Sequence, residues 1–474
     1  MDPELRRSLY WIMLLAAIGL MVGRIANAEL LLEPSMYKVN PTRVWPKERP
    51  EPFPTFSSND RSRWATVRSL VEEGTFVIGK RIPDESNSKG YRDEGILFTD
   101  GFKSVDVVLH PDRQEFFSTK PPLLTVMAAG EYWLMHKYLK WNIAEHRWEV
   151  VVLTLVTLNV LPLAVGLWLL SLLLEAYGRT DWGRLFVFAV ACFGTFLTTF
   201  SVTLNNHVPA ACCVFYAMYL IVKPRAEGQP VSLLAGLGAG LFAGMAVCLD
   251  LPAAALAGAL AAVLMFQSPK TLLTYLPAAI LPMALQTWVN HEAIGTWEPI
   301  YAKFGGIWYE YPGSHWAKRH LPDQPQYPGI DFADEPKTIY TFHLLFGHHG
   351  LFSLTPVWLL ALVGLSLKGN DAGASRSVRH WSLAVLAVVI GFYIWKSNNY
   401  GGWTSGPRWF FWITPLLLWG LLPAADSLAG SRLGRGFALL CFGAGVFAAV
   451  FPWTNPWRHP WIFQWGEYMG WFRY

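Results

Sequence analysis

Three charged side chains stand in local sequences that could support proton transfer or phosphate binding. Asp60 precedes apolar residues at helical spacing, Lys120 is followed by two prolines, and Arg408 follows the glycine-rich stretch NNYGGWTSGP. A carboxylate facing a water-poor pocket can accept a proton from a hydroxyl nucleophile. Lysine and arginine both bind phosphate, and arginine can do so with two hydrogen bonds. These residue types predict a general base and a phosphate-binding site.

Each of the three side chains also has a plainer interpretation. Aspartate is among the best residues for capping a helix N-terminus, and position alone favours that role for Asp60, which does not exclude proton transfer. Composition alone favours Lys120 as a lysine whose ammonium reaches the membrane interface beside a helix-starting proline pair. Arg408 presents the same two alternatives as Lys120.

Further polar side chains stand at the mouths of apolar segments. In the stretch TLNNHVPAA, Asn206 and His207 could bind a sugar or a metal, although capping of the following helix is slightly favoured. Asp250 is most simply a solvated turn between two apolar runs. His348 and His349 have no acidic partner at a fixed spacing, so they are a weak signal for a metal site. The sequence contains no Walker loop, HExxH motif or Rossmann glycine pattern, which disfavours nucleotide-driven transport and soluble-type cofactor binding.

The elements that must position these residues are membrane helices. Hydrophobic residues make up 53% of the 474 residues and charged residues only 15%, a composition typical of a chain surrounded by lipid. Several apolar runs reach the roughly 20 residues needed to cross a bilayer. The sequence therefore predicts an all-α polytopic membrane protein with about eleven spans, near 9–28, 150–174, 184–201, 208–222, 232–249, 252–267, 271–289, 351–367, 380–396, 409–424 and 435–452.

Charge predicts the orientation of these spans. With a cytoplasmic N-terminus, each short loop assigned to the cytoplasm is basic, as the positive-inside rule requires. The C-terminus and the residues that could do chemistry then lie on the exported side. We expect an integral protein of the bacterial inner membrane, with a transmembrane domain over residues 1–452 and an exported aromatic tail over 453–474. Residues 29–149 and 290–350 are the two long exported loops.

The first exported loop, 29–149, is expected to carry interfacial helices. Asn59 or Asp60 can cap an amphipathic helix that begins at Arg61, lies on the membrane and ends at Gly74. The polar stretch 80–112 has no clear periodicity. The prolines after Lys120 can open a second helix, from Leu123 to about residue 139.

Several of these stretches resemble one enzyme family. NDRSRWATVRSLVEEGTF and the downstream FFSTKPPLL resemble the first exported loop of membrane glycosyltransferases with the GT-C fold, in the group of the protein O-mannosyltransferases and lipid A aminoarabinose transferases. GLFSLTPVWLLALVGL and GGWTSGPRWFFWITPLLL also resemble segments of that group. The first-loop pattern falls on Asp60, Arg63, Trp64, Gly74, Lys120, Pro121, Pro122 and Leu123.

The resemblance implies an inverting transfer of one sugar from a polyprenyl-phosphate carrier to a hydroxyl acceptor on a protein, lipid or glycan. It implies that Asp60 is the catalytic base and that Lys120 and Arg408 bind the donor phosphate. Arg63, Asn206 and His207 are the expected substrate-binding residues. Membrane lipids are expected partners and nucleic acid is not.

The chain departs from the family pattern at one position. Many relatives carry a second acidic residue where this chain has Asn206, and an amide cannot act as a base. We therefore expect no required cofactor and assign no metal ligand, although a divalent metal is compatible with the fold. Two other functions remain open: a non-catalytic protein that binds or assembles lipid-linked glycans, and a polytopic transporter.

Overall fold

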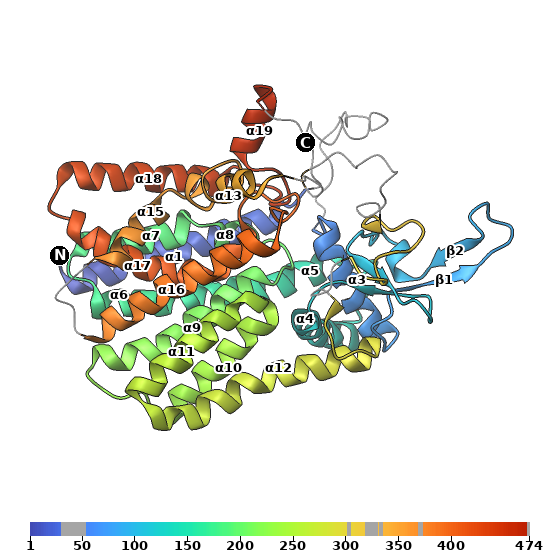
Figure 1. Ribbon diagram of the computed structural model, residues 1–474, viewed down its shortest axis with the longest axis horizontal. Coiled ribbons are helices and arrows are strands. Elements are labelled where there is room, and N and C mark those ends of the chain that lie inside the picture. Colours follow the sequence, from blue (N-terminus) through green and yellow to red (C-terminus); the bar gives the residue numbers. More distant parts are fainter. Residues whose placement is uncertain (30–53, 301–304, 318–329, 331–334, 368–372, 472–474) are drawn as a thin grey trace.

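The computed structural model describes residues 1–29, 54–300, 305–317, 330, 335–367 and 373–471. Long helices lie alongside one another and form most of the molecule (Figure 1). A smaller region that contains α3, α4 and the strands projects from one end of these helices. This arrangement places the first long loop of the sequence beside the ends of the apolar helices.

Eight helices in the described residues are long and apolar enough to cross a membrane. They are Pro3–Ala26 (α1), Arg147–Tyr177 (α5, Arg147–Leu155; η3, Val156–Val160; α6, Leu161–Tyr177), Asp181–Phe200 (α7, Asp181–Phe193; α8, Phe196–Phe200), His207–Ala226 (α9), Pro269–Ile294 (η5, Pro269–Thr271; α12, Leu272–Ile294), Ser377–Lys396 within α16 (Gly373–Lys396), Arg408–Leu428 (η9, Arg408–Ile413; α17, Thr414–Leu428) and Arg432–Val450 (α18).

Three further expected spans form shorter apolar helices of 10–17 residues. They are Leu233–Leu249 (α10), Leu251–Gln267 (η4, Leu251–Ala253; α11, Ala254–Gln267) and Val357–Ser366 (α15). The structure thus contains the apolar helices typical of an integral membrane protein. The count of eleven membrane crossings stays a prediction.

Helices α10 and α12 pack closely because one face of α10 carries glycine at every fourth residue. A Cβ atom added at Gly240 would lie 2.2 Å from the carbonyl oxygen of Tyr275, and one added at Gly244 would lie 2.1 Å from that of Ala279. Gly236 makes a similarly close approach to Thr271. Small residues at this spacing let the backbones of membrane helices approach each other.

The two ends of the helix bundle carry different residues. At one end Arg6 of α1 pairs with Glu175 of α6 at 2.5 Å and with Asp181 of α7 at 2.6 Å, and Asp426 of α17 accepts the Thr180 N–H at 2.9 Å. At the other end α9 begins where α10 ends. The segments expected in the cytoplasm and those expected to be exported therefore lie at opposite ends, and which end faces the cytoplasm stays a prediction.

The first long loop contains a sheet, which the all-α prediction missed. Four antiparallel strands pair in the order β2-β1-β4-β3. Their bounds are Gly79–Pro83 (β1), Tyr91–Glu94 (β2), Val107–Leu109 (β3) and Glu115–Ser118 (β4), with a short helix η1 at Ile96–Phe98. The stretch 80–112 that lacked periodicity supplies three of these strands. Its strands are three to five residues long, too short for a clear alternating pattern.

Helix α3 (Ser58–Glu72) begins three residues earlier than expected. Its N-cap is Ser57, not Asn59 or Asp60, and Asp60 is the third helical residue of a capping box. The expected end is correct, since Gly74 adopts a φ of +69° just after the helix. Burial of α3 extends beyond its apolar side: Ser62, Arg63 and Thr66 are also buried, because α4 and β4 pack against the helix.

The remaining elements lie around the ends of the long helices. The proline pair opens α4 (Pro122–Leu134), and a π-helical turn (η2, Met135–Leu139) continues it, as the sequence predicted. Part of the loop 290–350 lies outside the described residues. Its described part includes α13 (Lys337–Leu345), and α14 (Leu351–Leu354) follows. The aromatic tail contains α19 (Trp461–Tyr468), which packs through Phe463.

Candidate active site

The β3–β4 hairpin positions Lys120 against a carboxylate. Val107 pairs with Ser118, and the next residues in register are Asp106 and Thr119, whose N–H donates to the Asp106 carbonyl at 3.1 Å. Lys120 follows Thr119, and its Nζ lies 2.8 Å from Oδ1 of Asp106. The prolines that follow then start α4, so the ammonium is held between a strand end and a helix start.

Helix α3 presents Arg63 to the membrane helices. Its Nη1 donates to the side-chain and main-chain oxygens of Asn59, one turn earlier, at 2.6 Å and 2.8 Å. Its Nη2 donates to Oδ1 of Asn206 at 2.6 Å. The guanidinium is almost fully buried, and burial lowers its pKa to about 10, which leaves it charged at neutral pH.

Asn206 and His207 join the start of α9 to the end of α10. The amide nitrogen of Asn206 donates to the Leu249 carbonyl at 2.7 Å and to Oδ1 of Asp250 at 3.1 Å. The Nδ1 atom of His207 lies 3.0 Å from Oδ2 of Asp250. Asp250 is only 7% exposed, so its interpretation as a solvated turn is wrong. It is a buried carboxylate that holds two neighbouring side chains.

Arg408 completes this network from the glycine-rich segment. Its Nε donates to the Gly401 carbonyl at 2.9 Å, and its guanidinium lies over the ring of Trp457, 5.2 Å from the centroid. Its Nη1 lies 3.2 Å from Nε2 of His207. Because arginine can only donate, Nε2 of His207 must accept, and the imidazole proton is on Nδ1, facing Asp250.

Asp60 lies outside this chain of contacts. Its carboxylate accepts from the backbone N–H of Ser57 at 2.6 Å, from the Ser57 hydroxyl at 2.9 Å and from the backbone N–H of Phe56 at 2.9 Å. Both carboxylate oxygens of Asp60 therefore accept hydrogen bonds at the start of α3. Burial nevertheless raises the pKa of Asp60, which favours proton acceptance over a permanently ionised state.

Two groups of charges lie near each other. One is the Lys120–Asp106 pair, and the other is Arg63, Arg408 and Asp250 of the hydrogen-bonded network. Burial by itself would raise the pKa of Asp106, but the charges of Lys120, Arg408 and Arg63 lower it overall. Burial lowers the pKa of Lys120 to about 8. The three cations outnumber the two carboxylates by one, which favours an anion.

A pocket lies directly beside Lys120. Its wall combines the hydroxyl-bearing side chains of Thr66, Ser118 and Thr125 with the apolar side chains of Phe117 and Ile294. Hydroxyl groups can bond to a sugar or a phosphate, and the apolar wall can contact a sugar face or a lipid chain. Lys120 is one of the residues that line this pocket.

Five of the six residues expected at a site are therefore in one region: Lys120, Arg408, Arg63, Asn206 and His207. Sequence reasoning missed Asp106 and dismissed Asp250. The stretch SVDVVLHPDRQEFFS contains a signal for Asp106, since two β-rich runs flank a turn with Pro and Asp, which indicates a hairpin. For Asp250 the only signal in the sequence is its position between two apolar runs.

Comparisons with known proteins show no close relative. No family model and no curated protein matches the chain. Among solved structures, the oligosaccharyltransferase of Archaeoglobus fulgidus in its apo form is similar with a TM-score of 0.48 and 12% identity, covering 98% of this chain and 57% of that chain. The AglB oligosaccharyltransferase of the same organism, in complex with an inhibitory peptide and a dolichol-phosphate, gives 0.47 and 12%, with 98% and 57% covered.

A third structure, the same organism's oligosaccharyltransferase tethered to an acceptor peptide, gives a TM-score of 0.47 at 13% identity and covers 99% of this chain and 57% of that chain. This chain thus spans little more than half the length of these proteins. With TM-scores below 0.5, the similarity does not assign the chain to a family.

Proposed function

We propose that this protein is an inverting membrane glycosyltransferase that moves a single sugar from a polyprenyl-phosphate carrier to a hydroxyl acceptor. The observation that carries the proposal is the meeting of Arg63, Lys120 and Arg408 at one end of the helix bundle. The three cations come from segments far apart in the sequence and are buried or half-buried, and Lys120 also lines the pocket. Burying three charged side chains costs desolvation free energy, and an anionic ligand would offset that cost.

The location of the cations favours a phosphate that is attached to a lipid. Arg408 stands at the first residue of an apolar helix of 21 residues, and His207 begins another of 20 residues. A phosphate bound between these helix starts would leave its hydrocarbon chain beside apolar helices. A water-soluble phosphate ester would have no need of this placement.

The chemistry requires few groups from the protein. The acceptor oxygen attacks the anomeric carbon from the face opposite the phosphate, and the bond between that carbon and the phosphate oxygen breaks. The phosphate leaves with the electron pair, and its growing negative charge is stabilised by Lys120 and Arg408. The acceptor proton passes to a carboxylate, which we assign to Asp60 because it lies on α3 one turn before Arg63 and because burial raises its pKa.

The remaining residues position these groups. Asn206 and His207 hold Arg63 and Arg408 through the common partner Asp250. The proposed acceptor is a protein, a lipid or a glycan, and its hydroxyl enters from the side of the sugar that faces away from the two phosphate-binding cations. No metal ion takes part in the proposed step, since the cations of the chain neutralise the phosphate.

Donor binding tests this proposal without knowledge of the acceptor. Purified protein in detergent is titrated with polyprenyl phosphate that carries different sugars, beside Lys120→Ala and the matched surface variant Lys103→Ala. The proposal predicts saturable binding that Lys120→Ala weakens and Lys103→Ala leaves unchanged. Absence of binding to every donor by folded protein would contradict it and favour a transporter. Donor binding with no sugar release or transfer under any condition would favour a non-catalytic glycan-binding protein.

A further inference from the structure

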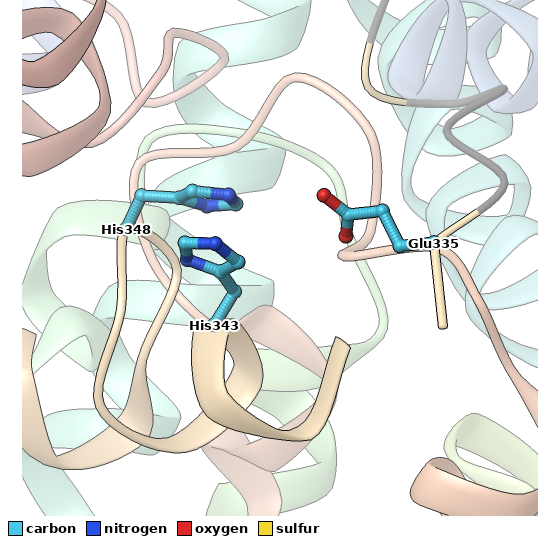
Figure 2. A group of neighbouring side chains, drawn as sticks. All are labelled: Glu335, His343 and His348. Carbon is cyan, nitrogen blue, oxygen red and sulfur yellow. The ribbon is translucent and has the colours of Figure 1, made fainter. Parts of the chain in front are cut away.

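A second group of polar side chains contacts Tyr400, in the glycine-rich segment that holds Arg408. Glu335, His343 and His348 each offer one ligand atom, and these three atoms lie within 4.8 Å of one another. Figure 2 shows the two imidazole rings side by side, with the carboxylate of Glu335 directed toward them. The ring centroids of His343 and His348 are 4.0 Å apart. Sequence reasoning had found no acidic partner for His348, and the structure supplies Glu335.

Local structure explains how these three residues meet. Glu335 stands just before α13, His343 lies in the last turn of that helix, and His348 lies in the turn after it. The chain reverses between His343 and Gly350, where Gly347 approaches the His343 ring and backbone so closely that a Cβ atom would lie 2.2 Å from Nδ1 of His343. One helix and its flanking residues therefore provide all three groups.

The surroundings of the group are unusually rich in imidazole. His349 is fully buried, and its Nδ1 lies 2.5 Å from Nδ1 of His348. Its Nε2 has no hydrogen-bond partner among the described residues. His459 from the aromatic tail also contacts His349, with ring centroids 6.0 Å apart. Burying several imidazoles together is costly unless their nitrogens are bonded.

Two neutral imidazoles and one carboxylate are a typical ligand set for Zn²⁺, in which three protein ligands leave a fourth position open. Zinc binds nitrogen and oxygen at about 2.0–2.2 Å, so tetrahedral ligand atoms are about 3.3 Å apart. The present separations of up to 4.8 Å require only small movements of the side chains to reach that geometry.

We propose that Glu335, His343 and His348 bind a zinc-class divalent cation. The expected consequence is structural. The hydroxyl of Tyr400 donates to Glu335, and the next residue, Gly401, accepts the Nε–H of Arg408. The cation would hold α13 and its two flanking segments together, and Tyr400 would connect Glu335 to the segment that positions Arg408. This site is separate from the proposed phosphate-binding residues, and its occupancy does not depend on the proposed function.

Metal binding by the full-length protein in detergent tests the proposal. After removal of metal with a chelator, the protein is equilibrated with Zn²⁺ in the presence of a chromophoric competitor, and bound metal is counted by mass spectrometry after gel filtration. Wild type should retain one ion per chain. The near-isosteric Glu335→Gln and the variant His343→Ala should weaken metal binding by about 100-fold. Loss of a metal ligand should weaken binding at least as much as loss of a group that hydrogen-bonds to a ligand. The exposed histidine variant His380→Gln should bind as wild type does.

Cobalt gives a second readout that needs no variant. Co²⁺ in a site of low coordination number with nitrogen and oxygen ligands should give visible absorption that Zn²⁺ abolishes by displacement. The proposal is overturned if folded wild type retains no metal above the level of a metal-free buffer control. It is also overturned if Glu335→Gln and His343→Ala retain as much metal as His380→Gln. Sugar transfer is scored separately, so failure of this proposal and failure of the proposed function give different results.

Discussion

Arg408 and His207 are 201 positions apart in the sequence, and Nη1 of the arginine lies 3.2 Å from Nε2 of the histidine. The contact fixes the imidazole proton on Nδ1, where Asp250 accepts it. Asp250 in turn accepts from Asn206, which holds Arg63. Two guanidinium groups from opposite ends of the chain are thus positioned by one buried carboxylate.

Loss of Asp250 should disturb both arginines. In Asp250→Ala the amide of Asn206 and the imidazole of His207 each lose a buried acceptor, which should lower the free energy of unfolding by about 1–3 kcal/mol. Donor affinity should fall with it. Thermal unfolding and donor titration in detergent measure the two effects. The exposed variant Asp112→Ala is the control, and equal behaviour of the two variants would show that Asp250 does not position the site.

Removal of the Lys120 ammonium should weaken donor binding strongly. Truncating one partner of a buried charge pair costs about 2–5 kcal/mol, and Asp106 would also be left without its cation. Lys120→Ala should therefore raise the donor dissociation constant by at least about 30-fold. Exposed Lys103, in the same loop, provides the matched variant Lys103→Ala. If Lys120→Ala changes the donor dissociation constant by less than threefold, this lysine does not bind the donor phosphate.

The reaction should lose efficiency as the pH rises through about 8. Burial lowers the pKa of Lys120 to about 8, so its ammonium is charged below that pH and neutral above it. The donor phosphate stays negative across this range, and only the charged form attracts it. The pH profile of kcat/KM reports the free enzyme and should show this decline. Lys120→Arg keeps its charge and should flatten the profile; an unchanged decline in that variant would assign it to another group.

Asp60 has two roles that a pair of variants can separate. Ser57→Ala removes the capping hydroxyl but keeps the carboxylate, and should lower the free energy of unfolding by about 1 kcal/mol with turnover retained. Asp60→Asn should lower turnover by at least about 100-fold, the contribution of a general base. Similar turnover losses in the two variants would reduce Asp60 to a capping residue. A larger loss in Asp106→Asn than in Asp60→Asn would move the base to Asp106.

The close packing of α10 on α12 should not tolerate a larger side chain. A Cβ atom at Gly240 would lie 2.2 Å from a backbone oxygen of α12, so Gly240→Leu must separate the helices. We expect a loss of more than about 2 kcal/mol in the free energy of unfolding. At Gly258 of α11 nothing lies within 4 Å of an added Cβ. Gly258→Leu should unfold as wild type does, and equal thermal stability of the two variants would contradict the packing.

Sequence patterns predicted the long elements well because hydrophobicity identifies them directly. The apolar runs became helices at the expected places, and Gly74 and the proline pair Pro121–Pro122 mark a helix end and a helix start. The short strands were missed because β3 has only three residues, and their pairing depends on contacts between strands. The helix start at Ser58 was misplaced because three consecutive residues, Ser57, Ser58 and Asn59, can all cap.

The site was predictable by residue type more than by arrangement. Lys120 and Arg408 stand beside proline and glycine, which signal special backbone positions in any sequence. For Asp106 the only signal is the hairpin pattern around it, and Asp250 has none beyond its position between two apolar runs. The tertiary structure brings these carboxylates to Lys120 and His207. Conversely, the carboxylate of Asp60 points toward its own helix start, which its position alone had favoured.

Sugar transfer from a defined donor tests the central proposal most directly. Purified protein in detergent is incubated with a panel of radiolabelled polyprenyl-phosphate sugars, and released or transferred sugar is measured for wild type, Lys120→Ala, Asp60→Asn and the control Lys103→Ala. We predict release or transfer from at least one donor by wild type and Lys103→Ala, with at least about 100-fold less by Asp60→Asn and Lys120→Ala. Folded wild-type protein that neither binds nor cleaves any of these donors would contradict the proposed function.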